Sequence, residues 1–112
     1  MFVEHYMTED MIYTTGAKRE VLEPRYDLIP PDTIRRLALI YTEGAKRYGE
    51  HNWQKGLPYS TTVNHLIEHL LKWLESDTSE DHLAKVIWGC AALMYYEDNC
   101  KHCDDLFFGK SN

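Results

Sequence analysis

The feature that most constrains the fold is a run between Val86 and Tyr96 in which almost every residue is apolar. Two acidic residues, Glu80 and Asp81, precede it and favour a helix start, because acids are stabilised at the positive end of the helix dipole. We therefore expect a helix from about Glu80 to Glu97. A helix that is apolar all round must be covered all round. Two other helices of a 112-residue chain do not easily do this, so we expect a second copy of the chain to contribute cover.

Apolar residues at helical spacing predict two further helices upstream. The first begins near Pro31 or Asp32, because Pro suits the first helical position, and ends at Gly49. Its apolar stripe is wide enough to predict burial on more than one side. The second begins after residues 60–62, which are good helix caps. Residues 76–79 break its pattern and supply the cap of the third helix.

The expected fold is therefore all-α, a small helical bundle in one domain over residues 1–112, because this length fits a single domain. Residues 1–30 show no sustained period and are predicted to form an irregular arm packed across the rest. Residues 31–98 form the helical core with its three main helices. Residues 99–112 form a tail with one helical turn around residues 106–108. No strand pattern rises above the helical one.

Charge and cysteine content exclude several classes of protein. The net charge is −6, and an acidic chain is a poor binder of duplex nucleic acid. No apolar run approaches the roughly 20 residues of a membrane span, and the N-terminus lacks a secretory signal pattern. We expect a cytoplasmic protein without membrane partners. Its three cysteines, Cys90, Cys100 and Cys103, are therefore expected to be reduced thiols.

Residues 44–56 combine glycines, cations, amides and aromatics in a mixture that no hydrophobic core requires. Glycines let a backbone approach a ligand closely, Lys and Arg bind phosphate, and Asn and Trp can hold a base. Residues 16–19 repeat part of this pattern. The alternative for any single cation is an ordinary surface charge. The predicted triphosphate ligands are Lys18, Arg19, Arg25, Lys46, Arg47 and Lys55. The predicted base or sugar contacts are Tyr48, Asn52 and Trp53.

A second polar cluster at residues 77–82 contains three carboxylates and a histidine. Helix capping explains the acids but not His82. If the polar stripe of the second helix faces this turn, the polar side chains of that helix and those of residues 77–82 converge on one site. Carboxylates bind Mg²⁺ or Mn²⁺, which polarise phosphates and activate water. The predicted metal ligands are Glu68, Asp77, Glu80 and Asp81. The predicted catalytic residues, which orient water or contact phosphate, are His69 and His82.

Two shorter motifs have simpler interpretations. His65, Glu68 and His69 match H-x-x-E-H, the inverted zinc-protease motif. A protease also needs a third ligand and a substrate cleft, so a polar helix face or a different site explains the motif better. Cys100 and Cys103 form one C-x-x-C pair, which is half of a zinc site. Without a second pair, free thiols remain the default interpretation.

With these residues in view, the sequence resembles a phage-borne family of small all-α nucleotide pyrophosphohydrolases related to MazG, the N-terminal domain of dATP/dGTP diphosphohydrolase. The resemblance implies an α-helical, oligomeric, metal-dependent enzyme of the host cytoplasm. Such an enzyme splits a nucleoside triphosphate, here a purine deoxynucleotide, into monophosphate and pyrophosphate. The matching blocks are residues 16–19 with 25–31, 44–49 with 52–56, and His69 with 77–84.

Three positions depart from the family pattern. Glu68 stands where the family carries Arg, Ser76 where it carries Gly, and Gly89 where it carries Asn. The paired E-x-x-E and E-x-x-D motifs of MazG enzymes are also missing. Losing the Arg removes a phosphate ligand, and Glu68 repels a triphosphate that carries no metal. The departures favour an alternative, a non-catalytic phage protein that binds a nucleotide or a host protein. A purely structural helical oligomer is the third hypothesis.

Overall fold

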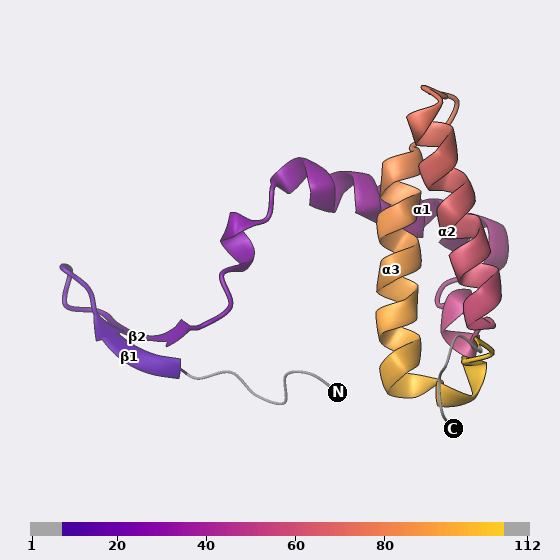
Figure 1. Cartoon of the computed structure of the whole chain (residues 1–112). Helices are drawn as coiled ribbons and strands as arrows, with labels where there is room; N and C mark the ends of the chain where they lie inside the picture. The colour runs from indigo at the N-terminus through magenta and orange to yellow at the C-terminus, as the bar shows by residue number, and fades with distance from the viewer. Residues whose placement is uncertain (1–7, 107–112) are drawn as a thin grey trace. The chain divides into compact units, whose positions relative to one another are not determined.

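The structure is a computed structural model that describes residues 8–106 of the chain, and it is predominantly helical, as predicted (Figure 1). The main elements are α1 (Pro31–Tyr48), α2 (Tyr59–Leu74) and α3 (His82–Asn99). The chain divides into two compact units, one ending at Pro30 and one beginning at Pro31. None of the described helices is both long and apolar enough to cross a membrane.

The first unit contains a β-hairpin, so the prediction of an irregular arm without strands was wrong. Strands β1 (Thr8–Ile12) and β2 (Lys18–Leu22) pair antiparallel. Neither strand alternates apolar and polar residues, so the period-two signal of a strand is missing from the sequence. The tight turn sets the pairing. Gly16 takes φ +89° there, a conformation that glycine adopts readily.

A short 3₁₀ turn, η1 (Tyr26–Leu28), follows the hairpin, although the prolines at residues 30 and 31 favour extended backbone before them. Arg25 stabilises this turn by pairing with the carboxylate of Asp27 through two hydrogen bonds, of 2.8 and 2.7 Å. The restriction imposed by Pro30 acts only on the residue before it, and Ile29 is indeed extended.

Helix α1 has the predicted bounds, and Gly49 ends it with φ +93°. Helix α2 begins earlier than predicted, at Tyr59, which places residues 60–62 inside its first turn. Its cap comes from the tail. The carboxylate of Asp105 accepts hydrogen bonds from the Ser60 amide, at 2.8 Å, and from the Ser60 hydroxyl. A distant acceptor thus performs the task that sequence reasoning gave to local hydroxyls.

Helix α3 begins at His82, and its cap is Asp81 rather than a residue of the 76–79 segment. The Asp81 carboxylate accepts the Ala84 amide at 3.2 Å and a two-point ion pair from Arg36 of α1, at 2.7 and 2.8 Å. Glu80 consequently precedes the helix instead of lying in its first turn. Because the residue that caps α3 also pairs with Arg36, the start of α3 is held against α1.

Helices α2 and α3 pack side by side (Figure 1), and Gly89 explains how closely. A Cβ built at Gly89 would lie 3.0 Å from Cδ1 of Leu66 and 3.3 Å from its Cβ. The absence of a side chain therefore lets the two helices approach. This contact gives a packing reason for Gly89 at a position where the resembled family carries Asn.

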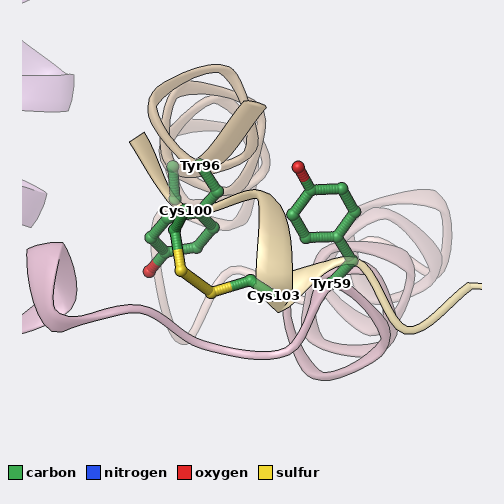
Figure 2. Close-up of a cluster of buried hydrophobic side chains, with 5 residues drawn as sticks. Tyr59, Tyr96, Cys100 and Cys103 are labelled. Atoms are coloured by element: carbon green, nitrogen blue, oxygen red, sulfur yellow. A yellow bond between two sulfur atoms is a disulfide. The ribbon is translucent and has the colours of Figure 1, made fainter. Parts of the chain in front are cut away.

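The buried cluster at one end of this helix pair contains a disulfide between Cys100 and Cys103, shown with Tyr59 and Tyr96 in Figure 2. The prediction of reduced thiols was therefore wrong for these two residues. The 3₁₀ turn η3 (Lys101–Cys103) brings their Cα atoms to 5.5 Å, within the usual range for a disulfide. Cys90 is a free thiol, as predicted, and it is exposed. The helical turn predicted around residues 106–108 lies mostly outside the described residues.

Apolar side chains remain exposed on all three helices. No residue of α1 is fully buried, so its predicted burial on several sides does not occur within one chain. Met94 of α3 is 64% exposed. On α2, Ile67, Leu71 and Leu74 are 48%, 48% and 64% exposed. These surfaces are the ones that the expected second copy would have to cover.

Candidate functional site

The second unit contains a cavity of about 940 Å³ between the C-terminal half of α1, the 3₁₀ turn η2 (Asn52–Lys55), α2 and α3. The helical phase of α1 and the loop after Gly49 bring residues 44–53 to its wall. Five of the predicted substrate-binding residues line it, together with the predicted catalytic His69. Those five residues are Lys46, Arg47, Tyr48, Asn52 and Trp53.

Aromatic rings form one wall of the cavity, and Trp53 lies at their centre. The Trp53 ring meets Tyr95 edge-to-face at 4.9 Å, Tyr41 at 5.9 Å and Trp88 at 6.4 Å between centroids. Its backbone carbonyl accepts a 2.6 Å hydrogen bond from the hydroxyl of buried Tyr96. Burial raises the pKa of both Tyr41 and Tyr96. Trp53 is therefore held firmly, as a packing residue that also lines the cavity.

The cationic residues lie at the end of α1. Lys46 and Arg47 are exposed, and the Arg47 guanidinium lies 5.1 Å from the centre of the Tyr48 ring. Tyr48 itself is 61% exposed. Lys55 follows on η2 but does not line the cavity. Neither Lys46 nor Arg47 forms an ion pair with another residue that the structure describes. These two cations can therefore bind an anionic ligand without first losing a partner.

The remaining predicted phosphate ligands belong to the first unit. Lys18 and Arg19 are exposed on β2. Arg25 is engaged with Asp27, whose pKa is lowered by that hydrogen-bonded ion pair. Their contribution to the same site stays a prediction.

Two histidines meet where α2 passes the start of α3. Nδ1 of His69 lies 2.9 Å from Nδ1 of His82. Ligand atoms of His69, His82 and Glu80 all lie within 4.8 Å of one another. His82 is 2% exposed, whereas His69 is partly buried and also lines the cavity. The polar stripe of α2 and the turn before α3 thus come together at these three residues.

Neighbouring charges define the surroundings of the pair. The pKa of His69 is lowered by burial, against the charge of Glu80, which raises it. Glu80 forms an ion pair with Lys85, a residue of the cavity wall. Asp77 Oδ1 lies 3.4 Å from Nε2 of His82, a buried nitrogen without a regular hydrogen bond. Hydrogen bonds from the Ser79 hydroxyl and amide lower the pKa of Asp77 to about 2.

The four carboxylates predicted as metal ligands are not gathered at one point. Among the residues that the structure describes, only Glu80 belongs to the histidine group. Asp81 caps α3 and pairs with Arg36, which lowers its pKa. Asp77 faces the outer side of His82. Glu68 is exposed on α2 and lies outside the group.

Sequence reasoning missed Lys85 and Arg36. Each pairs with an acid of the 77–82 cluster, Lys85 with Glu80 and Arg36 with Asp81. Glu80 precedes α3, so the helical i, i+4 rule does not indicate its pairing with Lys85. Arg36 reaches Asp81 across 45 residues of sequence, and only tertiary packing reveals such a pair.

A second group of possible ligands consists of Cys100, His102 and Cys103. The two sulfurs are bonded to each other, and a disulfide sulfur is not the thiolate that binds metal. In this oxidised form the group is a structural element beneath the aromatic wall.

Comparison with known proteins gives one family. No curated protein matches the chain, and no solved structure matches it. The family described as dATP/dGTP diphosphohydrolase, N-terminal, matches residues 13–106. That range begins within the first unit, after strand β1, and includes the cavity and the histidine group of the second unit. The chain therefore belongs to the family of the dATP/dGTP diphosphohydrolase N-terminal domain.

Proposed function

We propose that the protein is a metal-dependent nucleoside triphosphate pyrophosphohydrolase. It converts a purine deoxynucleoside triphosphate to monophosphate and pyrophosphate. The family description supports hydrolysis of dATP or dGTP. The observation that carries the proposal is the cavity of about 940 Å³, which joins an aromatic wall, exposed cations and the His69 corner. Its size falls in the range of small-molecule sites.

The base and the phosphates would use different walls of the cavity. Asn52 offers hydrogen-bond donors and an acceptor to a base, and the neighbouring Trp53 ring offers an apolar contact. Lys46 and Arg47 are exposed cations that can bind phosphate oxygens. Lys85 supplies a further cation beside Glu80. The triphosphate would then extend from the end of α1 toward His69.

Of the two expected ions, Mn²⁺ fits the donor types at this corner better than Mg²⁺. Glu80 offers a carboxylate oxygen and the histidines offer ring nitrogens, while Asp81 and Asp77 have other partners. A bound divalent ion neutralises phosphate charge and polarises the phosphorus under attack. Lys46, Arg47 and Lys85 would hold the triphosphate. His69, at the edge of the cavity, would offer the lone pair of a ring nitrogen to the ion.

Turnover of nucleotides tests the proposal. The full chain is incubated with each dNTP and with Mn²⁺ or Mg²⁺, and the products are separated. We expect monophosphate and pyrophosphate, with a loss of at least about 100-fold in rate for His69→Ala. Glu75→Ala, an exposed change at the end of the same helix, is the matched control. No turnover of any nucleotide would contradict the enzyme proposal.

A second candidate is a nucleotide-binding protein without catalysis. The observation that favours it is that Glu80 and Asp81 are already neutralised by Lys85 and Arg36. Calorimetry with dATP and dGTP separates the two candidates. Nucleotide binding that survives chelation of metal, without turnover, selects the binding protein.

A further inference from the structure

We infer that His69, His82 and Glu80 form a binding site for a divalent transition-metal ion, with Mn²⁺ favoured over Mg²⁺ of the two expected ions. The donors would be two imidazole nitrogens and one carboxylate oxygen. This replaces the all-carboxylate set expected from the sequence. The role of the ion in hydrolysis rests on the proposed function, but its binding does not.

The distance between the two rings suits a shared ion. Their Nδ1 atoms are 2.9 Å apart. Two nitrogens that lie about 2.1 Å from one ion, at right angles to each other, are separated by about 3 Å. Glu80 lies within reach, since ligand atoms of all three residues fall within 4.8 Å of one another. The three donors come from α2, the turn before α3 and α3 itself, so the fold holds them together.

The surroundings of His82 set its proton on the far side of the ring. Nε2 of His82 is buried, lacks a regular hydrogen bond and lies 3.4 Å from Oδ1 of Asp77. A carboxylate that faces one ring nitrogen favours the proton there and leaves the lone pair on the other nitrogen. Two hydrogen bonds from Ser79, of 2.8 and 2.6 Å, fix Asp77 in turn. Asp77 is therefore a positioning residue rather than a ligand.

Lys85 is the cation that competes with an ion at this site. It pairs with Oε1 of Glu80, so a metal ion must share that carboxylate or displace the ammonium group. Because Lys85 also lines the cavity, the displaced ammonium group could meet a ligand there. Removing this cation should strengthen metal binding.

The donor types decide the metal. Mg²⁺ prefers oxygen ligands and keeps several waters, whereas imidazole nitrogen suits the transition metals. A site with two imidazoles and one carboxylate should therefore discriminate against Mg²⁺.

Cobalt titration tests the site without any nucleotide. Co²⁺ is added to the metal-free full chain, and bound ion is followed by visible absorption. We expect one ion per chain, displaced by Zn²⁺ or by an excess of Mn²⁺ but not by the same excess of Mg²⁺. His69→Gln and Glu80→Gln should each weaken binding at least about tenfold. Lys85→Met should tighten it.

Two histidine variants are the matched controls. His65→Gln changes an exposed residue one turn earlier on α2, and His102→Gln changes the group beside the disulfide. Both should leave Co²⁺ affinity unchanged. Circular dichroism checks the fold of every variant, and His69→Gln and Glu80→Gln alter residues that are not fully buried.

Absence of Co²⁺ binding in the unaltered protein would overturn the inference. A loss of affinity in His65→Gln or His102→Gln as large as in His69→Gln would also overturn it, and so would displacement of Co²⁺ by the same excess of Mg²⁺ as of Mn²⁺. The proposed function fails separately. If metal binds through His69 but no nucleotide is turned over, the proposed enzyme is contradicted and the metal site is kept. If nucleotide is turned over with Mg²⁺ alone and Co²⁺ does not bind, the metal site is contradicted and the proposed enzyme is kept.

Discussion

At the scale of single residues, Gly56 couples the cavity wall to the disulfide. It follows η2, which carries Trp53, and takes φ +106°. A Cβ at this position would lie 2.8 Å from Sγ of both Cys100 and Cys103. The backbone conformation and the close sulfurs both require glycine.

Replacing Gly56 therefore tests this contact. We expect Gly56→Ala to lower the free energy of unfolding by about 1–3 kcal/mol. The alanine would strain the backbone at this positive φ, and its Cβ would also clash with the two sulfur atoms. Urea unfolding measures it. Gly44→Ala is the control. Gly44 lies within α1 with no atom within 4 Å of a built Cβ, so this change should be neutral or stabilise by up to about 1 kcal/mol. An equal loss in both variants would contradict the argument.

At the scale of elements, the tail stabilises the start of α2. The hydrogen bonds from Ser60 lower the pKa of Asp105 below its ordinary value of 3.8. A carboxyl group with a lowered folded-state pKa stabilises the protein above its unfolded-state pKa. That stabilisation is lost as the pH falls through the folded-state pKa.

The Asp105→Ala variant should accordingly have a lower Tm than the unaltered protein at pH 7, with a difference that shrinks as the pH falls below 3.8. Thermal unfolding across this pH range measures it. Glu97→Ala, an exposed change on α3, should show no such dependence. A constant difference at all pH values would argue against the charge of Asp105 as the cause.

The disulfide stabilises the turn after α3. It closes a loop with a sequence separation of 3, and the loop-entropy relation gives about 2 kcal/mol for so short a loop. A reductant should therefore lower the free energy of unfolding of the unaltered protein by about this amount. The Cys100→Ser/Cys103→Ser variant should not respond to reductant. Cys90→Ser, at a free and exposed cysteine, should respond like the unaltered protein.

At the scale of the whole molecule, the exposed stripe on α2 supports association with a second copy. Ile67, Leu71 and Leu74 recur at helical spacing and are 48%, 48% and 64% exposed. Light scattering should find an oligomer at micromolar concentration, because such a stripe is typical of a helix–helix interface. Ile67→Glu with Leu71→Glu should give a monomer. Leu28→Glu, at another exposed leucine, is the control, and a monomeric unaltered protein would contradict the prediction.

The helices were the part of the fold that sequence could predict. Apolar spacing and terminal signals such as Pro31 and Gly49 are local, so the bounds of α1 agreed closely and those of α2 and α3 agreed to within a few residues. The hairpin was not predicted, because neither strand alternates apolar and polar residues. The caps of α2 and α3 were assigned wrongly because Asp105 reaches Ser60 from a distant segment and Asp81 is held by Arg36.

Sequence by itself thus determined the family, the helical class and the part of the cavity wall formed by residues 44–53, because these depend on spacing and residue type along one stretch of chain. Tertiary structure alone decided which polar groups meet. It joined His69 to His82, paired the acids with Lys85 and Arg36, and linked Cys100 to Cys103. The physical reason is that ion pairing and ligand grouping act over a few ångströms in space, between residues whose separation in sequence carries no periodic signal.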